Sequence, residues 1–148
     1  MRRSERLKVV LDLEKRREQA ALEVFQSAQA DLRHQEERLE ELERYHGEYQ
    51  QQLRGNTNRT MAASQLHAGQ QFISQLAAAI AQQQQQVDHQ RERVEQAREE
   101  WRQAWERREG MARYIETCRE RERQEDERIE QKAVDEAANQ RFARAMRR

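Results

Sequence analysis

The chain has 148 residues, of which 38% are charged and only 5% are aromatic; it contains no proline, and its mean hydropathy is −1.36. This composition excludes a globular core of ordinary size and leaves either disorder or long paired helices. Lys plus Arg and Asp plus Glu balance at 28 each, so the basic excess typical of nucleic-acid-binding proteins is missing.

The first third of the chain repeats apolar residues at alternating steps of three and four. Ten of the fourteen positions on this track are apolar, and the register is kept over seven heptads. Such regularity predicts a coiled-coil helix over about residues 4–54, with Ser4 as its N-cap. The positions of this first track are Leu7, Leu11, Glu14, Glu18, Ala21, Phe25, Ala28, Leu32, Gln35, Leu39, Leu42, His46, Tyr49 and Leu53.

The pattern stops over about residues 55–60, where Gly55, Asn56 and Asn58 favour a turn. Asn58 or Thr60 is expected to cap a second helix over about residues 61–145, since no proline interrupts it. A second track then runs along Leu66, Gly69, Ile73, Leu76, Ile80, Gln83, Val87, Gln90, Val94, Ala97, Trp101, Ala104, Arg108, Met111, Ile115 and Cys118.

A short loop between two such tracks predicts antiparallel neighbours, so we expect one all-α domain over residues 1–148, a long helical hairpin whose second helix is the longer. Pairing residues whose numbers add to about 115 aligns the two tracks. Leu39 then faces Leu76, and Tyr49 faces Leu66. The first track should pack firmly from Leu32 onward, because each well-buried Leu or Phe contributes about 1.5–3 kcal/mol.

Near the N-terminus the expected packing is weaker. Glu14 and Glu18 occupy consecutive track positions, and in the predicted register Glu18 faces Ala97. Buried carboxylates offset much of the apolar gain. We therefore expect this end to open easily or to be completed by a partner.

A change in composition marks the turn of the hairpin. From Gln50 to Val87 there is no acidic residue, and only Arg54 and Arg59 are basic, whereas charges elsewhere come about every second residue. Within this stretch Phe72, Leu76 and Ala79 form an apolar stripe beside the track. An apolar stripe beside a filled contact line is a candidate docking surface.

Signs of enzymatic chemistry are weak. The four histidines have no i, i+4 partner and no nearby cysteine, so we expect no metal site. The many carboxylates lie at helical spacing from arginines, which is typical of a solvated helix surface. A helix pair offers no concave substrate pocket. The chain is expected to be a protein-binding molecule without a cofactor, not an enzyme.

The expected location is cytoplasmic. The lone Cys118 cannot form an internal disulfide, which suits a reducing compartment. No apolar run approaches the ~20 residues that cross a bilayer, and no signal-peptide block follows Met1. Both chain ends are rich in arginine, which fits either solvated termini or insertion against an acidic partner.

Four segments resemble the FliJ family of the flagellar type III export apparatus. They are the N-terminal heptads from Leu7, the segment Tyr45-His46-Gly47-Glu48-Tyr49, the segment Gln70-Gln71-Phe72-Ile73 with Leu76, Ala79 and Ile80, and the elements Trp101-Arg102 and Gln131-Lys132-Ala133-Val134-Asp135-Glu136. Their order and spacing match the family along essentially the whole chain.

The resemblance implies a stalk similar to the γ subunit of rotary ATPases. Such a stalk binds the hexameric flagellar export ATPase and the export gate protein FlhA, escorts export chaperones, and associates peripherally with the inner membrane through the export apparatus. Carried onto this sequence, the gate contact falls on Phe72, Leu76 and Ala79. The ATPase contact falls on the C-terminal segment at Gln131, Lys132, Asp135 and Glu136.

Two alternatives stay open at the level of sequence. One is a stalk of a virulence-type secretion system, against which the Gln70-Gln71-Phe72-Ile73 segment argues. The other is a coiled-coil scaffold unrelated to secretion, which would have a charged rather than a neutral turn region.

Overall fold

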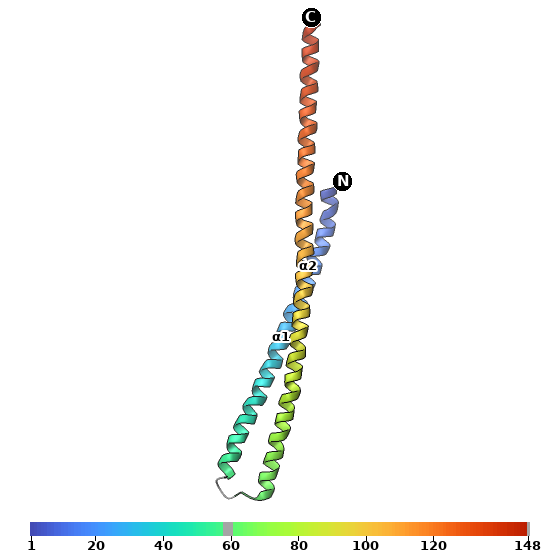
Figure 1. Ribbon diagram of the computed structural model, residues 1–148. Helices are drawn as coiled ribbons and strands as arrows, with labels where there is room; N and C mark the ends of the chain where they lie inside the picture. Colours follow the sequence, from blue (N-terminus) through green and yellow to red (C-terminus); the bar gives the residue numbers. More distant parts are fainter. Residues whose placement is uncertain (58–60, 148) are drawn as a thin grey trace. The chain divides into compact units, whose positions relative to one another are not determined.

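The computed structural model describes residues 1–57 and 61–147, with side chains for 1–56 and 61–147. Two α-helices account for almost all of this: α1 (Arg3–Thr57) and α2 (Ala63–Met146) (Figure 1). No strand occurs in the described ranges. The prediction of an all-helical chain with two helices packed against each other is confirmed.

The helix ends differ from the expected ones by a few residues. In α1 the first backbone bond runs from Arg6 N–H to the Arg2 carbonyl, 3.1 Å, so Arg2 rather than Ser4 precedes the helix. The same helix continues to Thr57 and includes Gly55, expected to lie in the turn. The predicted caps Asn58 and Thr60 lie outside the described residues.

The chain divides into two compact units. Unit 1 contains Met1–Glu18 and Gln103–Arg148, and unit 2 contains Gln19–Arg102. Each unit therefore pairs a stretch of α1 with a stretch of α2.

In unit 2 the two stretches are antiparallel. The rings of Tyr49 and Phe72 meet edge to face with centroids 4.8 Å apart, and those of Phe25 and Trp101 stack at 6.0 Å. Val87 is fully buried between the helices. As numbers rise along α1 they fall along α2, as an antiparallel coiled coil requires.

Gly69 sits where the helices of unit 2 come close together. A Cβ atom there would lie 2.8 Å from Cδ1 of Leu53, well inside van der Waals contact. The glycine on the second track therefore makes room for a leucine of the first.

The predicted tracks are the observed contact lines. All fourteen positions of the first track are partly buried, and all sixteen positions from Leu66 to Cys118 are partly or fully buried. Beyond Cys118 the burial becomes sparse, and Glu122 is partly buried. Asp126 is partly buried, whereas Glu125 and Ile129 are exposed.

The predicted register is wrong. Gln35 bonds Gln83, and Tyr49 packs on Phe72 rather than Leu66, so these pairs add to 118 and 121 rather than about 115. The reason lies in the helix ends: α1 runs on to Thr57 and α2 begins at Ala63, which moves the centre of the hairpin along the chain. When α2 shifts along α1 by whole helical turns, the same residues stay on the contact line. The predicted tracks are therefore correct although the predicted register is not.

In unit 1 charged and polar side chains supplement a short apolar contact. Ile115 and Cys118 of α2 are 2% and 5% exposed. On the α1 side, Glu18 lies 3.7 Å from the Arg108 guanidinium, not opposite Ala97 as expected. Every described residue from 127 to 147 is exposed.

Candidate protein-binding surfaces

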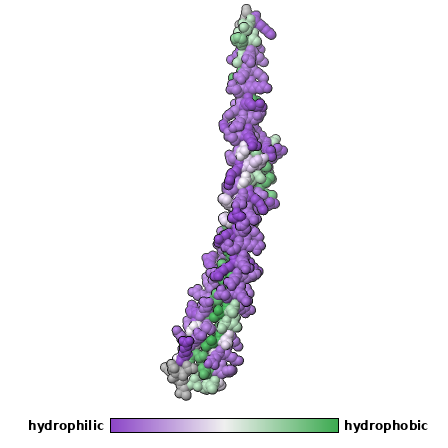
Figure 2. Space-filling view, in the orientation of Figure 1, coloured by the Kyte–Doolittle hydropathy of each residue, from purple (hydrophilic) through white to green (hydrophobic). Residues whose placement is uncertain are grey.

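The first candidate surface is the tip face, formed by Phe72, Leu76 and Ala79 of α2. Phe72 remains 44% exposed although its ring touches Tyr49, while Leu76 and Ala79 are partly buried. The structure thus puts Phe72 at the edge of the contact line and Leu76 within it. Figure 2 shows hydrophobic residues gathered along this part of the helices.

Two glutamine contacts replace apolar layers within the contact line of unit 2. The Gln83 amide donates to the Gln35 side-chain oxygen at 2.7 Å and to the Gln35 carbonyl at 3.0 Å. The Gln90 amide donates to the Ala28 carbonyl at 3.2 Å. Buried polar groups that bond only when aligned favour one register over its neighbours.

The second candidate surface is the C-terminal segment with Gln131, Lys132, Asp135 and Glu136. All four residues are exposed, and the Gln131 amide donates to Asp135 Oδ1 at 3.2 Å. Positions i, i+1, i+4 and i+5 share one side of a helix. The structure therefore presents them together, on unit 1, whereas the tip face belongs to unit 2.

A third feature, the N-terminal clasp of Arg2, Ser4, Glu122 and Asp126, was missed from the sequence. Glu122 accepts bonds from the Ser4 backbone N–H at 3.1 Å and from Ser4 Oγ at 2.6 Å. Arg2 Nη2 lies 2.6 Å from both Asp126 oxygens. An acid from α2 thus binds a free N–H group at the start of α1 and complements its dipole.

The electrostatics of the clasp follow from these bonds. The hydrogen bonds from the Ser4 hydroxyl and backbone, helped by the Arg2 charge, lower the pKa of Glu122 from its usual value. The hydrogen bond and charge of Asp126 raise the pKa of Arg2. Both pKa shifts show that the clasp favours the ionised forms of Glu122 and Arg2. The position of Glu122, four residues after Cys118 at the end of the second track, was the one sequence signal that pointed to this contact.

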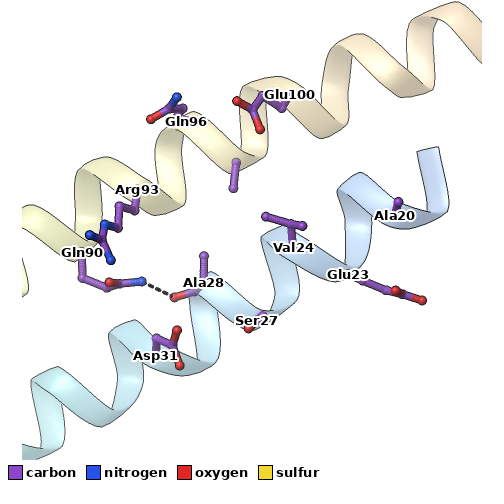
Figure 3. Close-up of a pocket in the computed structure, with 11 residues that line it drawn as sticks. Ala20, Glu23, Val24, Ser27, Ala28, Asp31, Gln90, Arg93, Gln96 and Glu100 are labelled. Atoms are coloured by element: carbon purple, nitrogen blue, oxygen red, sulfur yellow. Dashed lines mark hydrogen bonds between the residues drawn. The ribbon is translucent and has the colours of Figure 1, made fainter. Parts of the chain in front are cut away.

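A fourth feature is a groove of about 690 Å³ between the helices of unit 2 (Figure 3). Its α1 side carries Val24, which is 56% exposed and points toward the facing helix, and the Gln90–Ala28 hydrogen bond crosses it. The lining residues are Ala20, Glu23, Val24, Ser27, Ala28, Asp31, Gln90, Arg93, Gln96, Ala97 and Glu100.

Within the described ranges, no group of three or more His, Cys, Asp or Glu side chains is arranged to hold a metal ion. Most carboxylates near arginines pair along one helix, as Glu99 does with Arg102 at 2.6 Å. No described helix is long and apolar enough to cross a membrane.

The fold defines a class: an all-helical protein in which two long helices pack against each other. Comparison with known families is more specific. The model of the flagellar FliJ protein matches residues 3–147, so the chain belongs to the FliJ family and is a component of the flagellar export apparatus. The resemblance drawn from the sequence is thereby confirmed. No curated protein and no solved structure shows significant similarity to the chain.

Proposed function

We propose that this chain is the cytoplasmic stalk of the flagellar type III export apparatus, linking the hexameric export ATPase to the export gate protein FlhA. It also escorts export chaperones. Membership of the FliJ family supports the export role. The two kinds of exposed surface, one apolar and one charged, support two different partners.

The gate contact is assigned to the tip face. The observation that carries it is the Phe72 ring, 44% exposed within a stretch that has no acidic residue from Gln50 to Val87. A large aromatic side chain with little charge around it is typical of the residues that dominate protein interfaces. Leu76 and Ala79 extend that face along α2.

The ATPase contact is assigned to Gln131, Lys132, Asp135 and Glu136. These side chains are exposed on a stretch of α2 that has no buried residue from 127 to 147. A helix with no covered face is open to a partner, and its mixed charges provide specificity. A stalk bound in this way resembles the γ subunit of rotary ATPases, and it associates with the inner membrane through the apparatus rather than by insertion.

The test of the gate contact is Phe72→Asp, with Ser74→Asp as its matched control. Both changes add one carboxylate to the same turn of α2, but Ser74 is exposed on the opposite side of the helix. Phe72→Asp should weaken binding to FlhA about 30-fold or more and abolish swimming, because a buried aromatic contact is replaced by a charge. Ser74→Asp should leave both unchanged.

Leu76→Asp is a weaker test on its own, because Leu76 is partly buried and its loss costs stability. Helicity and the thermal midpoint by circular dichroism separate the two effects. Undiminished FlhA binding by folded Phe72→Asp would remove the tip face from the proposal.

A further inference from the structure

The groove of unit 2 is an apolar surface that the chain itself leaves open. Small side chains of α1 and α2 line it, and Val24 at its edge is 56% exposed. With a volume of about 690 Å³, it has room for several side chains of another helix. Helices bind in such grooves through apolar residues at i, i+4 and i+7 spacing.

The charged side chains around the groove have no ion-pair partner among the residues that the structure describes. Asp31, Arg93 and Glu100 form no ion pair with any described residue, and Glu23 only accepts a 3.4 Å bond from Gln19. Elsewhere on α2, arginines pair with glutamates three positions away, as in Arg119–Glu116 at 2.7 Å. Three carboxylates against one guanidinium make the rim acidic and fit it for a basic helix.

The chain itself contains a basic helical segment with exposed apolar side chains. Val134, Phe142 and Met146 are 62%, 65% and 73% exposed, and with Ala138 they form the C-terminal stripe at four-residue spacing. Arg141, Arg144 and Arg147 accompany it and make no ion pair within the described residues.

The two surfaces match in length and in charge. The groove extends along α1 from Ala20 to Asp31, eleven residue steps or about 17 Å, and the stripe extends from Val134 to Met146, twelve steps or about 18 Å. We propose that the groove of unit 2 binds the C-terminal stripe of a second copy of this chain, apolar residues against Val24 and arginines against Glu23, Asp31 and Glu100.

This contact does not depend on the proposed export role. It has a consequence for that role, because the stripe overlaps Gln131–Glu136. Self-association would cover the segment assigned to the ATPase, so free chains would be held in a form that cannot bind it. A contact of this size is expected to be weak, with dissociation constants in the micromolar range or above.

The test is sedimentation velocity of the full chain from about 5 to 500 µM, at about 50 mM and 500 mM salt. The weight-average sedimentation coefficient should rise with concentration, and the rise should shrink at high salt. Val24→Glu and Phe142→Glu should each raise the dissociation constant at least about tenfold. Ile129→Glu is the matched control, since Ile129 is 56% exposed on another side of α2.

Mixing the two variants tests whether the groove of one chain binds the C-terminal stripe of another. Val24→Glu blocks the groove and keeps the stripe, whereas Phe142→Glu does the reverse, so an equimolar mixture should recover a complex that neither forms alone. A chain that stays monomeric at all concentrations would overturn the proposal. So would a mixture that fails to associate, or association that Phe142→Glu abolishes and Val24→Glu does not, which would indicate contact between two stripes.

Discussion

Units 1 and 2 both pair a stretch of α1 with a stretch of α2, but they use different side chains. In unit 2 the buried contacts are mainly aromatic rings, valines and glutamine amides, and the charged contacts between its helices, such as Arg91 with Glu36 at 3.7 Å, lie at the surface. In unit 1 they include Glu18 with Arg108, Ser4 with Glu122 and Arg2 with Asp126. We therefore expect the helix contacts of unit 2 to persist over a wider range of pH and salt than those of unit 1.

A charge placed in the apolar layer of unit 2 should lower the stability of the chain most. Val87→Asp places an unpaired carboxylate where the native side chain is 0% exposed, so we expect a loss of about 3 kcal/mol or more in the free energy of unfolding. Val24→Asp, at a site 56% exposed on the other helix, is the control and should cost little. Urea unfolding followed by circular dichroism measures both. Similar losses of unfolding free energy in Val87→Asp and Val24→Asp would contradict an apolar contact line between the helices.

The next prediction is that Glu14 lowers the free energy of unfolding of unit 1. Glu14 occupies a track position with its side chain 13% exposed; its Oε1 lies 3.3 Å from Arg17, and its Oε2 is buried without a hydrogen-bond partner among described residues. Glu14→Leu should stabilise the chain by about 1–2 kcal/mol, because it replaces a poorly satisfied carboxylate with an apolar side chain. A thermal midpoint that falls would show that the carboxylate stabilises unit 1.

A smaller effect is expected at the N-terminal clasp. Glu122→Gln weakens the charge-assisted bonds to Ser4, so local opening of unit 1 should increase several-fold. Cys118 reports on this opening, because its thiol is buried in unit 1 and it is the single cysteine of the chain. Its labelling rate should rise in Glu122→Gln and stay unchanged in Glu125→Gln, whose partner Arg128 lies on the same helix.

Acid should weaken the clasp in the same way. The folded-state pKa of Glu122 lies below its unfolded value of 4.5, so its stabilising contribution is complete above that value and is lost as the pH falls through the lowered pKa. Protection of Cys118, measured against the unfolded chain at each pH, should fall below about pH 4.5 before the helix contacts of unit 2 are lost. Simultaneous loss would contradict the contrast between the units.

The repeat along the chain predicted which residues lie between the helices, from Leu7 to Cys118, because burial follows heptad position. It could not predict the register, since the same positions meet again after a shift of whole turns. Only the ends of α1 and α2 and specific pairs such as Gln35 with Gln83 decide that.

Site residues were predictable to different degrees. Phe72 stood out as an apolar residue beside the contact line, and its exposure agrees with that reading. The bonds of Ser4 with Glu122 could not be foreseen, because they depend on the register and join residues 118 positions apart. The assignment of Gln131–Glu136 came from family resemblance and stays a prediction.

A chain that links the export ATPase to the gate must bind both partners at once. With the export ATPase immobilised, FlhA should be retained only when this chain is added. Phe72→Asp should remove FlhA alone, and a chain ending at Glu130, which keeps Glu122 and Asp126, should fail to bind the ATPase while still binding FlhA. If the two partners compete for the chain, or if both variants lose both partners while remaining helical, the account of a link between ATPase and gate is wrong.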